Sequence, residues 1–144
     1  MRFNKMVPEL SVSSLKKSLG FYKGILGFRI EYERPENKFV FISLQGSQLM
    51  LQELKKGECN DAKSVWHTGK LEYPFGRGFH FQIEVKNIAP LMNSLKKNKY
   101  AVKAPVKESW FRQGKKLLGM RYFLVQDPDG YLFLFHQDIG SKKI

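Results

Sequence analysis

The stretch RYFLVQ (121–126), DPDG (127–130), YLFLFH (131–136) decides the fold. Two runs of β-branched and aromatic residues flank a turn signal, which predicts a β-hairpin. Pro128 presets φ at the second turn position, and Gly130 accepts the left-handed conformation that closes the turn. Residues 131–135 are apolar at every position, which indicates that both faces of the returning strand are covered. We expect a helix on one face and a pocket, a second subunit or both on the other.

Size and composition indicate a soluble globular protein. The 144 residues suit one domain with a core, and 42% of them are hydrophobic and 26% charged. No apolar run approaches the roughly 20 residues of a membrane helix, and residues 1–5 do not lead into the apolar segment of a signal peptide. The single cysteine, Cys59, cannot form an internal disulfide. We therefore expect a cytoplasmic protein without a membrane partner.

The formal net charge of +12 raises the question of nucleic-acid binding. The sequence has no arginine-rich block, no zinc-finger spacing and no RNA-binding aromatic motif. The lysines come as dispersed pairs, so a generic basic surface is favoured over an anionic ligand and over nucleic acid, which we do not expect as a partner. The pairs are Lys16-Lys17, Lys55-Lys56, Lys96-Lys97, Lys115-Lys116 and Lys142-Lys143.

The first half of the chain predicts the order βαβββ. A helix is capped by Ser13 or Ser14 and is ended by Gly27. Residues 55–77 then form a long polar connection, which with Trp66 and His67 suggests an arm against a partner or a lid. The expected elements are strands over 6–12, 28–33, 38–44 and 48–54 and a helix over 13–26.

The second half repeats this pattern at a constant offset, with Val12 aligned on Val85 and Ser14 on Asn87. An internal repeat of this kind predicts an α+β fold of two βαβββ units. Each unit is expected to be a curled mixed sheet with a helix on its convex face and a ligand-sized concave face. The expected elements are strands over 79–85 and 100–106, a helix capped by Asn87, a long loop over 107–118 and the hairpin. We assign one domain, 1–144, with repeat one at 6–54, the connecting loop at 55–77 and repeat two at 78–137.

The sequence resembles the vicinal oxygen chelate superfamily, which includes glyoxalase I, extradiol dioxygenases, fosfomycin-resistance enzymes and bleomycin-resistance proteins. The likeness covers nearly the whole chain. It is carried by Val12-x-x-Leu15-x-x-Ser18-Leu19-x-Phe21-Tyr22 with Leu26-Gly27-Phe28, by Gly78-Phe79-His80, and by Asp127-Pro128-Asp129-Gly130-Tyr131.

The resemblance implies four metal ligands in the metal-dependent branches, on the first and last strands of each repeat. Valine and leucine cannot ligate a metal, and a divalent site needs three or four N, O or S ligands. We therefore expect no metal and no other cofactor. The matching positions here are Val7, Met50 or Gln52, His80 and Leu134.

A divalent metal at His80 is kept as the less favoured alternative. A site improvised from His80, Glu84 and Glu9 is disfavoured, because residues four apart on a strand are separated by about 13 Å.

Strand periodicity selects a candidate ligand face with a few polar groups among apolar ones, as small-molecule pockets have. For His80, contact with a ligand and a structural hydrogen bond are equally supported. For His136, which is expected near a strand end, a structural role is favoured. Trp66 and Trp110, expected in loops, either pack a dimer or stack on a planar ligand. No catalytic residue is assigned. The candidate ligand-binding residues are Glu9, Met50, Gln52, Trp66, His80, Gln82, Glu84, Trp110, Arg112, Leu134 and His136.

The resemblance is strongest to the bleomycin-resistance branch, whose members lack the metal ligands and sequester a drug between two subunits. It implies a non-enzymatic, small-molecule-binding homodimer with a role in antibiotic resistance, with or without strands exchanged between subunits. A bleomycin-type drug is the candidate ligand, although a net charge of +12 opposes a cationic drug unless the cleft is locally acidic. The alternatives are a metal-dependent lyase, isomerase or dioxygenase with a reduced metal site at His80, and a basic module that binds nucleic acid.

Overall fold

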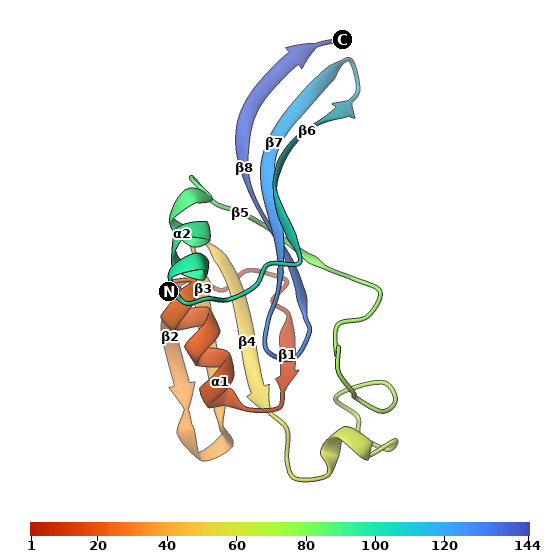
Figure 1. Cartoon of the computed structure of the whole chain (residues 1–144). Helices are drawn as coiled ribbons and strands as arrows, with labels where there is room; N and C mark the ends of the chain where they lie inside the picture. The colour runs from red at the N-terminus through yellow and green to blue at the C-terminus, as the bar shows by residue number, and fades with distance from the viewer.

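The computed structural model describes residues 1–144 and confirms the α+β fold of two βαβββ units (Figure 1). No helix is long and apolar enough to cross a membrane. The first unit contains β1 (Glu9–Val12), α1 (Leu15–Leu19), a π-helical continuation (Gly20–Ile25), β2 (Arg29–Arg34), β3 (Phe39–Leu44) and β4 (Ser47–Glu53). The second contains β5 (Phe81–Glu84), α2 (Ala89–Lys97), β6 (Ala104–Gln113), β7 (Lys116–Gln126) and β8 (Leu132–Lys143). Short 3-10 turns lie at Pro35–Asn37 and Glu58–Asn60.

Each unit forms a four-stranded mixed sheet, with strand orders β1-β4-β3-β2 and β5-β8-β7-β6. The first strand of each unit runs parallel to the last, and the other pairs are antiparallel. This arrangement follows from the chain order, because the helix carries the chain across the sheet after its first strand, whereas short turns join most of the later strands.

Both sheets contribute one face to a single hydrophobic core. The cluster joins Val40 and Leu51 of the first sheet with Phe123 and Phe135 of the second. The helices meet within this packing, since the Ser94 hydroxyl of α2 donates to the Ile25 carbonyl at 2.5 Å. The opposite faces, called the concave faces below, therefore point away from the shared core.

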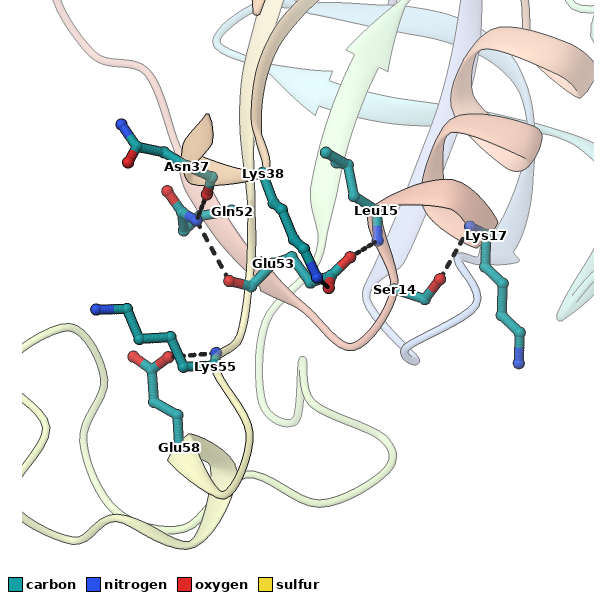
Figure 2. Close-up of polar contacts among 9 residues, drawn as sticks. All are labelled: Ser14, Leu15, Lys17, Asn37, Lys38, Gln52, Glu53, Lys55 and Glu58. Carbon is teal, nitrogen blue, oxygen red and sulfur yellow. Dashed lines mark hydrogen bonds and ion pairs between the residues drawn. The ribbon is translucent and has the colours of Figure 1, made fainter. Parts of the chain in front are cut away.

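The N-terminus of α1 is fixed by two side-chain acceptors (Figure 2). The Ser14 hydroxyl accepts from the Lys17 N–H at 3.3 Å, and the Glu53 carboxylate accepts from the Leu15 N–H at 2.8 Å. Lys38 donates to the same carboxylate at 2.7 Å, and these hydrogen bonds hold the pKa of Glu53 below its ordinary value. Serine thus caps the helix as predicted, while Glu53 ties the helix to the end of β4.

The turn 127–130 has the predicted geometry. Gly130 has φ +87°, its N–H donates to the Asp127 carbonyl at 3.0 Å, and the Asp127 carboxylate accepts from the N–H groups of Asp129 and Tyr131 at 2.9 and 2.8 Å. A carboxylate that binds backbone N–H groups two and four residues ahead stabilises a tight turn.

This turn also joins the two units. The Tyr22 hydroxyl donates to Asp127 at 2.7 Å, and Ser13 donates to Asp129 through its N–H at 2.9 Å and its hydroxyl at 2.5 Å. Burial raises the pKa of the Asp127 carboxyl to about 6, although its hydrogen bonds act in the opposite direction. Burial and the neighbouring Asp127 likewise raise the pKa of Tyr22. The second hairpin is therefore fastened to the first unit through buried carboxyl groups.

The strand expected over 100–106 is present but has other bounds, and the loop expected over 107–118 is wrong. The strand is β6, which begins at Ala104 and continues to Gln113, and a tight turn at Gly114 leads into β7. Polar residues such as Lys107 and Glu108 suggested a loop, but tertiary pairing with β7 overrides that local composition. Trp110 and Arg112 consequently lie in a strand rather than in a loop.

The expected end of the last strand is also wrong. β8 continues to Lys143, so His136 lies well inside the strand rather than near its end. β8 pairs with the long β7, which in turn pairs with β6, and these three strands form an extension that projects beyond the rest of the molecule (Figure 1).

We predict that replacing Asp127 by Asn makes stability less dependent on pH. The native carboxyl binds its proton up to about pH 6, against an ordinary value of 3.8, so the wild-type protein loses stability as the pH rises through this window. The difference between the two free energies of unfolding, wild type minus Asp127→Asn, should fall by up to about 3 kcal/mol between pH 3.5 and 7. Urea unfolding at several pH values measures this, and a difference that stays constant or grows with pH contradicts it.

We also predict that Gly130→Ala is more destabilising than Gly114→Ala. Both glycines have positive φ, but a Cβ at Gly130 would lie 2.4 Å from Pro74 Cβ, whereas a Cβ at Gly114 meets nothing within 4 Å. The Gly114 variant should lose about 1 kcal/mol from backbone strain alone, and the Gly130 variant about 1–3 kcal/mol more. Thermal unfolding of the two variants, which act as matched controls for each other, tests the steric contribution. Equal losses would contradict it.

Candidate functional site

The concave face of the first sheet brings three predicted residues together. Glu9 of β1 lies beside Met50 of β4, and Ser11 lies beside Gln52. The Gln52 amide donates to the Asn37 carbonyl at 2.6 Å (Figure 2), so its N–H group supports the turn before β3. Glu53 points to the helix side of the strand, as the periodicity predicts.

Aromatic residues that the sequence reasoning missed form the floor of this face. Phe39 and Phe41 alternate with core residues on β3 and are 2% and 0% exposed. Tyr32 stacks on Phe41 with 5.3 Å between ring centroids, and the Arg34 guanidinium lies 4.0 Å from the Phe39 ring centroid. The signal was present in the run FVFI (39–42), which is apolar at every position, like the last strand.

The N-terminal segment lies against the same face. Phe3 packs edge-on against Phe41 with 5.2 Å between centroids. The Asn4 N–H donates to the Gln48 side chain at 2.7 Å, and the Gln48 amide donates to the Arg2 carbonyl at 2.7 Å. Residues 2–4 therefore form one wall of the concave face.

The concave face of the second sheet brings four further predicted residues together. Gln82 lies beside Leu134, and Glu84 lies beside His136. The Glu84 and Gln82 side chains are exposed, whereas Leu134 is only 8% exposed. Apolar and hydrogen-bonding side chains thus alternate on this face as predicted.

Polar residues of β6 and β7 also lie on this concave face. The sequence analysis did not identify them, because residues 107–118 were expected to form a loop. Tyr122 lies beside His136, on the side opposite Glu84. Its hydroxyl lies 3.3 Å from the Ser109 hydroxyl, and its ring lies 5.8 Å from the Lys107 ammonium. The hydrogen bond to Ser109, supported by Lys107, lowers the pKa of Tyr122 from its ordinary value.

His80 lies just before β5, apart from every carboxylate cluster. Its Nε2 accepts from the Gln82 amide, with 3.2 Å between the nitrogen atoms. It borders a pocket of about 340 Å³ whose other lining residues include Lys103, Gln126 and Gly130. This environment supplies a hydrogen bond to the imidazole and a cation nearby, but no acidic partner.

A larger pocket, of about 580 Å³, lies between β1 and the connecting loop. It contains the predicted residues Glu9 and Trp66, and the loop therefore borders a cavity. The His67 Nδ1–H donates to the Gly69 carbonyl at 2.9 Å, which leaves Nε2 as an acceptor that is buried without a partner. The other charged lining residues are Lys70, Glu72 and Arg77.

Trp110 and Arg112 lie apart from these residues, on the extension of the second sheet. The Lys142 ammonium lies 4.1 Å from the Trp110 ring centroid, and the ring packs against the backbone at Gly119. Arg112 donates to the Gly114 carbonyl at 3.2 Å within the tip.

The residues at the family's metal positions do not fit a metal ion. Val7 and Leu134 offer only carbon atoms, and no three histidine, cysteine, aspartate or glutamate side chains lie close enough together to hold one. The improvised set of His80, Glu84 and Glu9 does not assemble either. The chemistry that this donor set supports is hydrogen bonding, ionic attraction and apolar contact.

Comparisons with known proteins agree with this fold. Residues 2–135 match the profile of the glyoxalase/bleomycin resistance protein/dioxygenase superfamily. No curated protein is significantly similar in sequence. A superfamily member from Vibrio splendidus 12B01 is 31% identical over 91% of this chain and 95% of that chain, with a TM-score of 0.42.

Two solved structures show the same fold at lower identity. An integron cassette protein from V. cholerae is 14% identical and has a TM-score of 0.64, with 95% of this chain and 97% of that chain covered. A lactoylglutathione lyase from Agrobacterium tumefaciens is 19% identical and has a TM-score of 0.53, with 93% and 92% covered. The profile match spans nearly the whole chain, and the chain therefore belongs to the glyoxalase/bleomycin resistance protein/dioxygenase superfamily.

Proposed function

We propose that the chain is a metal-independent small-molecule-binding protein that holds its ligand in a cleft completed by a second copy of itself. The observation that carries this proposal is the pair of concave faces, which lie opposite the shared core and combine apolar with hydrogen-bonding side chains. Such a mixture is typical of sites that bind small molecules.

The uncovered apolar side chains favour a dimer. Leu124 and Met120 lie on the concave face of the second sheet, in line with Leu134. Phe3 and Met50 lie on the first. In a two-fold dimer, the first sheet of one subunit would face the second sheet of the other, which buries apolar area while leaving polar groups for a ligand.

The side chains at the family's metal positions support binding of a ligand without a chemical reaction. Two of the four family positions, Val7 and Leu134, lack a ligating atom. A bleomycin-type drug is the specific ligand that we propose. Glu9 and Glu84 place a carboxylate on each concave face, where they can attract a cationic group locally, although the net charge of +12 opposes its approach from a distance.

A fluorescence titration tests ligand binding. Trp66 borders the pocket beside Glu9, whereas Trp110 packs beneath Lys142 in the extension, so Trp110→Phe leaves Trp66 as the reporter. We expect saturable binding of metal-free and copper-loaded bleomycin, at about one per subunit and with Kd near 1 μM, which is about −8 kcal/mol. Copper salt alone controls for quenching by the metal. A flat titration of the folded protein would remove the drug from the proposal.

Two further measurements separate binding from catalysis. Glu9→Gln and Glu84→Gln should each weaken bleomycin binding about tenfold, or about 1.4 kcal/mol, while Glu36→Gln in the exposed turn after β2 should leave it unchanged. Metal analysis of the purified protein should find no stoichiometric ion. A stoichiometric metal that disappears in His80→Ala would favour the lyase, isomerase or dioxygenase alternative instead.

The dimer has its own prediction. Met120→Glu places a charge on the concave face of the second sheet and should raise the dimer dissociation constant at least about tenfold, because a charge is costly in an apolar interface. Asn93→Glu adds the same charge on the exposed side of α2 and should have little effect. Sedimentation equilibrium measures both. A monomeric wild type, or equal effects of the two substitutions, would exclude this interface.

A further inference from the structure

The extension of the second sheet is a separate structural feature, named here the arm and defined as residues 107–121 and 137–144. It is formed by the distal parts of β6, β7 and β8, whose pairing continues to Gln113 opposite Lys116 and Lys116 opposite Lys143. The arm projects beyond the helices and the first sheet (Figure 1). Its outer end therefore contributes nothing to the shared core.

Strand pairing concentrates positive charge at the end of the arm. Lys115-Lys116 and Lys142-Lys143 are distant in sequence, but Lys116 lies directly opposite Lys143. Between Trp110 and Leu117 and beyond Gly140, no side chain is acidic. The cations of this tip are all exposed: Arg112, Lys115, Lys116, Lys142 and Lys143.

Like charges opposite each other on neighbouring strands are destabilising. The acidic side chains of the arm do not relieve this repulsion, since Glu108 pairs with Arg121 at 2.5 Å and Asp138 accepts from the Gly140 N–H at 2.7 Å. A stable fold tolerates such a cluster, and an anionic partner would gain from it. The cluster therefore has the charge of a docking surface for a polyanion.

We propose that the tip of the arm, whose cations lie outside the proposed ligand cleft, docks on the phosphate backbone of duplex nucleic acid. Strand pairing places Arg112 in the same cross-strand row as Lys142, and Lys116 in the next row with Lys143, so the cations lie on both faces. Phosphates line both sides of a groove, so cations on both faces of the arm's tip can each contact a phosphate. Because the proposed contacts are to phosphates, we expect binding to be independent of base sequence.

A membrane surface fits the arm less well. The turn between β6 and β7 is polar, from Gln113 to Lys116, so apart from Trp110 an apolar contact with a membrane would have to come from the exposed Phe111 and Ile144. The Trp110 ring is held beneath Lys142 and against Gly119, and so is not free to enter a bilayer interface.

The test compares two variants with the same net charge. The arm variant is Lys115→Gln, Lys116→Gln, Lys142→Gln and Lys143→Gln. The matched control carries the same four substitutions at Lys16, Lys17, Lys96 and Lys97, which are exposed on the helices. Binding to a fluorescein-labelled 20-base-pair duplex is followed by anisotropy at 25–200 mM KCl. Circular dichroism verifies that both variants are folded.

A plot of log K against log salt concentration has a slope whose magnitude is about 0.9 per phosphate contact. We expect this magnitude to fall by about 3–4 in the arm variant, which lacks four lysines, and by less than about 1 in the control. The affinity of the arm variant at 50 mM KCl should fall at least about tenfold, again through lost phosphate contacts. The proposal is overturned if the wild type does not bind the duplex at 25 mM KCl, or if the control loses as much as the arm variant. Arm-dependent binding to phosphatidylserine–phosphatidylcholine vesicles that equals or exceeds duplex binding also overturns it.

Discussion

The structure depends on the buried carboxyl groups of Asp127 and Asp129. They order a four-residue turn at the end of the second unit and accept hydrogen bonds from Tyr22 and Ser13 of the first. A buried carboxyl without partners would be costly, so the turn and the first unit must be placed together. The hydrophobic cluster supplies most of the burial, and these directional bonds fix how the halves meet. Because the halves meet through their helix-bearing sides, the other faces of both sheets become the surface on which ligands are expected.

The sequence predicted this architecture because its strongest signals are local and repeated. The DPDG turn, the serine cap of α1 and the spacing of Val12 and Val85 each have a short-range physical cause, and all appear in the structure. The alternation of side chains on β1, β4, β5 and β8 was equally readable. It assigned Glu9, Met50, Glu84 and His136 to the ligand face, and the strand register then makes Glu9 a neighbour of Met50 and Glu84 a neighbour of His136.

The features that the sequence did not yield all depend on pairing between distant segments. β6, which contains Trp110, is stabilised by pairing with β7, and its polar residues made the segment resemble a loop in the sequence. The same error concealed Tyr122, Lys107 and Ser109 as neighbours on one face. The lysine pairs looked dispersed because only β7–β8 pairing brings Lys116 to Lys143. The pocket beneath the connecting loop, with the free Nε2 of His67, depends on how the loop folds back over β1.

The wall formed by residues 2–4 breaks the equivalence of the two units. Two repeated units would present equivalent faces, but here they differ. Phe3 covers aromatic residues on the concave face of the first sheet, while the second sheet continues into the arm. The halves have therefore diverged in what they present to the surroundings while retaining a common scaffold. Substitutions on the aromatic face can reshape the space for a small molecule without touching the basic arm, and the reverse also holds. Duplication has given one short chain two surfaces that can evolve separately.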